Sequence, residues 1–225
     1  MRDPSVLEWP AREGSLVALA TRMTEAPWAV DDGDLARLRQ AGIRDEGVVQ
    51  AVTIAAVFNH LTRVADATGV APDYVSVLPR IQVDAGREAV ARPARREWPA
   101  PSPTPRVSLS LRPKTLEALL AWRTYARAPS AALSASDRAV LGTVTSNELC
   151  DGAGVSAWGD ARPTSPRERT LATYATKLTT LPWRVGEADL EPLRREGLDD
   201  RGLLDVMGVV GFQNMDSRVR LALGG

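Results

Sequence analysis

Apolar residues recur along most of the chain at intervals of three and four, the spacing that gathers them on one face of a helix. No two segments alternate apolar and polar residues as paired strands do, so the sequence predicts an all-α fold. The predicted helices cover residues 13–25, 32–41, 45–68, 114–128, 134–149, 168–180 and 200–223.

Two stretches of the chain match each other without a gap. The first opens at Leu16 and the second at Leu171, an offset of 155 residues (171 − 16). A match that keeps Pro-Trp, Gly and Asn/Arg in register indicates an internal repeat of one helical unit. The identical pairs are Pro27/Pro182, Trp28/Trp183, Asp34/Asp189, Leu38/Leu193, Gly42/Gly197, Asp45/Asp200, Asn59/Asn214 and Arg63/Arg218.

The same residue types mark the helix boundaries in each copy. A proline ends the first helix, and a glycine suited to the left-handed conformation follows the second. In the first copy an acidic pair also starts the second helix. We expect an aspartate to cap the third helix in each copy. In that order the residues are Pro27 and Pro182, Gly42 and Gly197, Asp31 with Asp34, and Asp45 and Asp200.

The third helix of the first copy, 45–68, is apolar on nearly every side. Val49, Val52 and Phe58 leave little polar face, which is typical of a helix at the centre of a bundle or in an interface. We therefore expect helix 45–68 to dock on helix 200–223 as a pseudo-twofold pair. The same feature predicts a homo-oligomer.

The repeat divides the chain into a partial unit, a linker and a full unit. We assign residues 1–78 to the partial unit, 79–112 to a proline-rich linker and 113–225 to the full unit. Proline-rich segments stay extended, so residues 91–106 are expected to run over the surface outside the core.

The composition excludes several classes of function. Lys+Arg and Asp+Glu are both 28 in 225 residues, so no net basic charge draws nucleic acid or an anionic membrane. No apolar run in the sequence approaches the roughly 18 residues of a membrane span, and the first residues lack a signal-peptide core. We expect a cytoplasmic protein. One cysteine and one histidine exclude an intrachain disulfide and predict neither a metal site nor a cofactor.

The string VVQAVTIAAVFNHLTRVADATGV carries a resemblance to a known family. Phe58, Asn59, Arg63, Asp66 and Gly69 fit the closing helix of peroxidase-related proteins in the alkylhydroperoxidase and carboxymuconolactone decarboxylase superfamily. The second copy keeps the residues Asn214, Arg218 and Gly224. The resemblance implies a helical bundle that associates through its helices, and an alkyl hydroperoxide reductase activity.

The chain departs from the redox motif of that family, in which a glutamate precedes C-x-x-C-x-x-x-H. With Cys150 on the first family cysteine, the second becomes Ala153, the histidine Ala157 and the glutamate Arg138. Shifted by one residue, the cysteine, cysteine, histidine and glutamate positions become Asp151, Gly154, Trp158 and Ala139. Either alignment removes the two-cysteine mechanism, which needs a resolving thiol one helical turn away. The glycines of DGAGVSAWGDA also predict a shortened helix there.

The remaining candidate site residues each have a structural and a functional interpretation. Cys150 is an inert buried thiol or a one-cysteine peroxidase, and His60 is a packed side chain or a catalyst. Asn59 with Arg63, and Asn214 with Arg218, are i,i+4 pairs that form either a buried network with carboxylates such as Asp66 or Asp45, or a pocket for a carboxylate ligand. Four tryptophans fill a core or line a pocket: Trp28, Trp122, Trp158 and Trp183.

The sequence leaves several functions open. The first is a non-redox binding or assembly protein, associated with itself or with an active relative. The second is a divergent antioxidant enzyme that uses Cys150 and an external thiol. The third, cofactor-free lactone decarboxylase chemistry, rests on family analogy.

Overall fold

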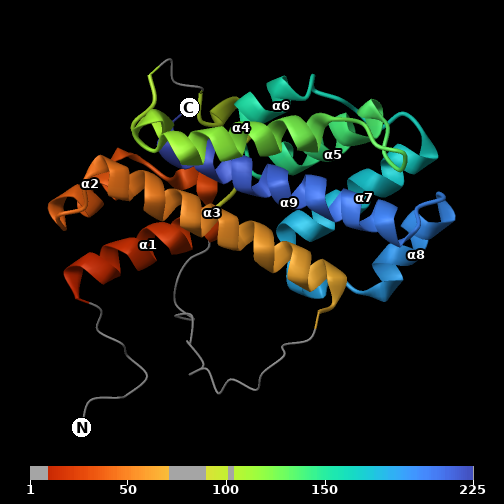
Figure 1. The fold of residues 1–225 in the computed structure, drawn as a ribbon, viewed down its shortest axis with the longest axis horizontal. Helices are drawn as coiled ribbons and strands as arrows, with labels where there is room; N and C mark the ends of the chain where they lie inside the picture. Colours follow the sequence, from red (N-terminus) through yellow and green to blue (C-terminus); the bar gives the residue numbers. More distant parts are fainter. Residues whose placement is uncertain (1–9, 71–89, 101–103, 225) are drawn as a thin grey trace, which may run out of the picture.

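The computed structural model describes residues 10–70, 90–100 and 104–224. Every regular element in these ranges is a helix, which confirms the all-α prediction (Figure 1). The α-helices are α1 (Ala11–Glu25), α2 (Asp32–Gln40), α3 (Asp45–Thr68), α4 (Pro113–Arg127), α5 (Ala135–Glu148), α6 (Gly152–Ala157), α7 (Pro166–Thr180), α8 (Glu187–Arg195) and α9 (Asp200–Leu223). Short 3-10 turns are η1 (Pro27–Ala29), η2 (Arg95–Glu97), η3 (Leu109–Leu111) and η4 (Pro182–Arg184).

Two series of elements have the same lengths and spacing. The bounds of α7, η4, α8 and α9 equal those of α1, η1, α2 and α3 plus 155, as in Ala11 and Pro166 (166 − 11). The prolines of η1 and η4 follow the ends of α1 and α7, as expected. The two matching stretches of sequence therefore adopt the same local structure.

Most of the predicted helix boundaries are confirmed. Asp31 caps α2 in a capping box with Asp34, and the glycines Gly42 and Gly197 follow α2 and α8 with φ values of 80° and 85°. These φ values lie in the left-handed region, which costs a glycine little.

The predicted caps of the long helices are wrong. Asp45 and Asp200 lie in the first turn of α3 and α9, where the positive end of the helix dipole stabilises an acidic side chain. The N-cap residue of α9 is Asp199, whose carboxylate accepts from the Gly202 amide, and that of α3 is Arg44, which makes no side-chain cap. Asp45 instead accepts a hydrogen bond from Arg39 at 2.7 Å.

The predicted packing of helix 45–68 on helix 200–223 is confirmed, since α3 and α9 form the most extensive helix pair (Figure 1). Phe212, Met215 and Val219 of α9 belong to a core with α1 to α4. Val206 and Val210, nearer its start, belong to a second core with α5, α7 and α8. Helix α9 therefore joins all the other long helices.

The described residues of 91–106 are exposed or half-buried, in agreement with the expected surface course, but the proposed linker 79–112 does not lie wholly at the surface. Val107 is 3% exposed and lies in the core, and the Arg106 amide donates to the Leu223 carbonyl at 2.7 Å. Arg92 pairs with Glu148 at 2.8 Å. These contacts hold the segment against α5 and α9 because its few apolar and arginine side chains find partners there. The proposed 78/79 boundary lies outside the described residues.

Among the described helices, α3 is long and apolar enough to cross a membrane by length and composition. The sequence prediction of no membrane span did not anticipate this. Core helices of ordinary bundles meet the same criterion, and one face of α3 packs on α9 here.

Candidate functional site

Cys150 lies at the carboxyl end of α5 and not inside a helix. Its φ of 57° is left-handed, its amide donates to the Asn147 carbonyl, and the Asp151 amide donates to the Ser146 carbonyl. These two bonds form a Schellman motif, in which this position usually holds glycine. The geometry stops α5 at the point where a helical C-x-x-C motif would have to continue.

The surroundings of the Cys150 thiol disfavour a thiolate. The residue has no exposed surface, and burial raises its pKa although Arg92 acts in the opposite direction. The negative end of the α5 dipole also opposes an anion at this position. A peroxide is attacked by the thiolate and not by the thiol. Cys150 is therefore poorly suited to nucleophilic chemistry.

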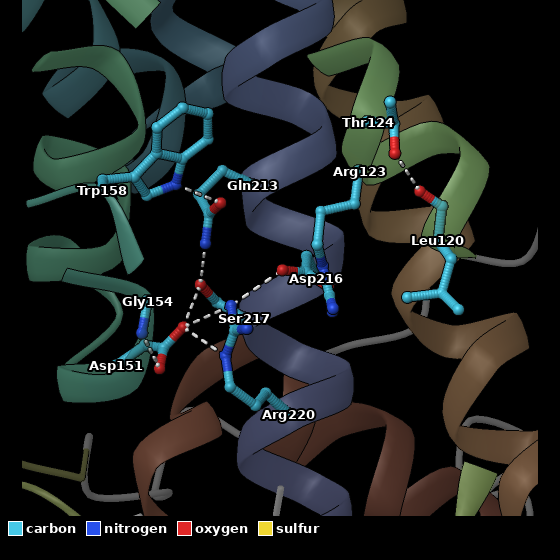
Figure 2. Close-up of polar contacts among 10 residues, drawn as sticks. All are labelled: Leu120, Arg123, Thr124, Asp151, Gly154, Trp158, Gln213, Asp216, Ser217 and Arg220. Atoms are coloured by element: carbon cyan, nitrogen blue, oxygen red, sulfur yellow. Dashed lines mark hydrogen bonds and ion pairs between the residues drawn. The ribbon is translucent and has the colours of Figure 1, made fainter. Parts of the chain in front are cut away.

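The predicted shortening of the next helix is confirmed, because α6 has only six residues. Asp151 caps α6 by accepting from the Gly154 amide at 2.9 Å, and it also accepts from Ser217 Oγ at 2.7 Å and Arg220 Nε at 3.1 Å (Figure 2). Asp151 is 1% exposed. A buried carboxylate with three donors is fully satisfied and has little capacity left to bind a ligand.

Asp151, Ser217 and Arg220 belong to a network of hydrogen bonds that continues along α9 in both directions (Figure 2). Trp158 Nε1 donates to Gln213 at 2.7 Å, and Gln213 donates to Ser217 at 2.8 Å. On the other side, Asp216 accepts from Arg220 at 2.8 Å and from Arg123 of α4 at 2.6 Å.

Charges cancel among the ion-paired members, since two carboxylates, Asp151 and Asp216, face two arginines, Arg123 and Arg220. The Arg127 guanidinium lies beside them, 4.9 Å from the centre of the Trp158 ring. Burial acts to lower the pKa of Arg220, but the two carboxylates outweigh it and raise that pKa. The sequence interpretation missed Gln213, Asp216 and Ser217. Three polar residues within five positions of an apolar helix were the available signal.

His60 supports the structural interpretation. It is 7% exposed, its ring meets Trp122 edge-on at 4.8 Å, and burial lowers its pKa while a Gly211 backbone contact acts against this. A Cβ on Gly211 would lie 2.5 Å from His60 Nδ1. Gly211 thus makes room for the imidazole in the α3/α9 interface.

The two Asn/Arg pairs connect the two halves of the molecule. One half contains α1, η1, α2 and α3, and the other contains the matching elements α7, η4, α8 and α9. Within each half, asparagine donates to a threonine near the end of the first helix: Asn59 to Thr24 at 2.9 Å and Asn214 to Thr179 at 3.1 Å. Each asparagine also accepts from its own arginine, with Arg63 at 3.0 Å and Arg218 at 2.8 Å.

The arginines reach across to the other half. Arg218 donates to the Met23 and Thr24 carbonyls at the end of α1, at 3.0 and 3.3 Å. Arg63 donates to the Thr179 carbonyl at the end of α7, at 3.1 Å. Both arginines therefore bind helix carboxyl ends, where unpaired carbonyls favour a cation.

The predicted carboxylate partners for these arginines are wrong. No ion pair with a carboxylate involves Arg63 or Arg218 in the described part of the chain. The charge of Asp66 raises the pKa of Arg63 from a distance, without an ion pair. Burial lowers the pKa of Arg63 to about 10, and burial together with the nearby Arg63 charge lowers that of Arg218.

A central pocket of about 500 Å³ lies between the two halves, and both arginines line it. Asn59, Trp28 and Trp183 also line it, whereas Trp122 packs against His60 and Trp158 belongs to the α6 network. The structure thus brings Asn59, Arg63 and Arg218 into one site. His60, Asn214 and Cys150 are not in its lining.

No group of three or more histidine, cysteine or acidic side chains in the described ranges could hold a metal ion. Comparison with protein-family models, curated proteins and solved structures finds no match to this chain.

Proposed function

We propose that the chain is a non-redox member of the alkylhydroperoxidase-like helical proteins and serves in binding or assembly. The observation that carries this proposal is the state of Cys150, which is buried, left-handed and placed after the end of α5. Asp151, Gly154 and Trp158, the residues at the family's active-site positions in the shifted alignment, belong to an ion-paired buried network. Such a network stabilises the bundle and contains no thiol that could attack a peroxide.

Two enzymatic functions remain as alternatives. A divergent antioxidant enzyme would use Cys150 with an external thiol, but the raised pKa of that thiol argues against it. Cofactor-free lactone chemistry would need a base beside the bound substrate. Glu148, one carboxylate at the central pocket, is already paired with Arg92 and so is a poor base.

Assembly would use the exposed side of α3. Ile54, Phe58 and Leu61 follow one another at helical spacing and are 49%, 62% and 50% exposed. An apolar stripe of this kind marks an interaction surface more often than isolated apolar residues do. We propose self-association through this stripe, with an active relative as the alternative partner and the cytoplasm as the location.

A peroxidase assay tests the non-redox proposal. With cumene hydroperoxide and dithiothreitol, we expect no enzyme-dependent loss of thiol, because Cys150 has no exposed surface and burial raises its pKa, so that little thiolate is available to attack the peroxide. Cys150→Ser should behave like the wild type. A rate that exceeds the uncatalysed rate and disappears in Cys150→Ser would show that the proposal is wrong.

A further inference from the structure

The central pocket differs from the α6 network in its charge balance. Two guanidinium groups line it, and each is held only by neutral acceptors: backbone carbonyls and the oxygen of an asparagine. Arg63 is 5% exposed and Arg218 is 1% exposed. Buried cations without a paired anion are costly, so an anion that reached these two guanidinium groups would be stabilised by them.

One arginine also has an unused donor. Arg218 places its Nε on the Met23 carbonyl, but Arg63 Nε is buried without a partner. The indole Nε1 of Trp28, another lining residue, is likewise buried and without a partner. An unsatisfied buried donor costs about 1–3 kcal/mol. Two such donors in the wall of one pocket indicate that an acceptor belongs there.

The rest of the lining limits what the acceptor can be. Trp28 and Trp183 offer aromatic surface, and Trp183 is 67% exposed. Carboxylates Glu25, Asp66 and Glu148 also line the pocket and repel a multiply charged anion more strongly than a singly charged one, so the lining favours a single negative charge placed on the guanidinium side. The volume of about 500 Å³ falls within the usual range for small ligands.

We propose that this pocket binds a small aromatic monocarboxylate, with its carboxylate on Arg63 Nε and Trp28 Nε1 and its ring against Trp183. Charge-assisted bonds to a guanidinium explain the requirement for a carboxylate. Both N–H groups are covered by neighbouring atoms, so the ligand separates the pocket walls slightly as it enters. This inference rests on the proposed binding function and names its ligand class.

Calorimetric titration of the full chain with benzoate, and with benzamide as its neutral analogue, tests the proposal. We expect benzoate to bind about tenfold tighter than benzamide, the effect of one charge-assisted bond. Arg63→Met should weaken benzoate binding by about tenfold and leave benzamide binding almost unchanged. Arg184→Met is the matched control, because Arg184 is exposed, follows Trp183 and does not line the pocket. It should bind benzoate like the wild type.

Trp28→Phe keeps the test decisive if Arg63→Met does not fold. It retains a ring and removes only the indole N–H, so benzoate affinity should fall by about three- to tenfold. Equal affinity for benzoate and benzamide, or unchanged binding in both pocket variants, would overturn the inference and leave the non-redox proposal intact. Peroxidase turnover that depends on Cys150 would instead overturn the proposed function, whatever the benzoate result.

Discussion

The two long helices α3 and α9 have matching sequences and matching lengths, yet their surroundings differ. In α9 an unbroken run from Val209 to Val219 is buried, whereas α3 alternates buried and exposed positions. Helices α4, α5 and α7 pack on α9, but α3 has no equivalent of α5 among its described neighbours. The number of packed neighbours, and not the helical pattern itself, sets how far each helix is buried.

The side chains follow this difference. Ile54, Phe58 and Leu61 on α3 are apolar and exposed, and the equivalent positions on α9, 155 residues later, are Val209, Gln213 and Asp216. Gln213 and Asp216 are buried because Trp158 and Arg123 of the neighbouring elements satisfy them. The same helix position therefore carries a buried polar group in one half and an exposed apolar group in the other.

The largest expected effect is a difference in the free energy of unfolding between variants of the two arginines, Arg218 and Arg63. Arg218→Met should lower the free energy of unfolding by about 3–5 kcal/mol, since it leaves the carbonyls at the end of α1 without a donor. Arg63→Met should cost about 1–2 kcal/mol, because Arg63 makes one bond to the other half and its Nε has no partner to lose. Urea unfolding measures both values. Equal losses of stability would contradict this difference and show that the contacts of Arg63 and Arg218 with the opposite half contribute equally.

A smaller effect concerns the starts of α1 and α7. Glu168 accepts from Ser136, Thr164 and Ser165, and these bonds lower its pKa to about 2. Its equivalent in α1 is the exposed Glu13 (168 − 155). Glu168→Gln should cost about 1–2 kcal/mol at pH 7, and Glu13→Gln should cost almost nothing.

The pH dependence of this effect has a defined sign. Because the folded pKa of Glu168 is below the ordinary 4.5, its contribution is complete above about pH 4.5 and is lost as the pH falls toward 2. Urea unfolding at pH 7 and pH 3 should therefore show a smaller difference between wild type and Glu168→Gln at the lower pH. A constant difference would contradict the assigned hydrogen bonds.

The smallest effect on stability, but a decisive one for assembly, concerns the α3 stripe. Phe58→Ser should change the free energy of unfolding by less than about 0.5 kcal/mol, because the ring is mostly exposed. Light scattering should show at least a dimer for the wild type and the 24.2 kDa monomer for Phe58→Ser. Leu204→Ser, at an exposed apolar position of α9, is the control and should remain a dimer. A monomeric wild type would refute self-association.

Local sequence signals located the helices well. Apolar spacing, prolines, glycines and capping residues placed α4 and α5 within one residue and α1 within two, because helix formation depends mainly on neighbouring residues. Asn59 with Arg63, and Asn214 with Arg218, could be recognised as functionally or structurally important for the same reason. Polar side chains on an apolar helix must find partners.

The identity of those partners could not be read from the sequence. Arg218 bonds to Met23, 195 positions away, and Ser217 bonds to Asp151, 66 positions away. Periodicity carries no information about such distant pairs, so carboxylates close in sequence were the natural but incorrect choice for Arg63.

The sequence by itself determined where the helices lie, that two stretches share one pattern, and that no second cysteine stands beside Cys150. Only the tertiary structure decided that Cys150 is buried beyond a helix end, that Asp151 anchors an ion-paired network, and that Arg63 retains a free donor in a pocket. The physical reason is that helices form from local contacts, whereas burial and charge balance depend on groups that meet only when the helices pack.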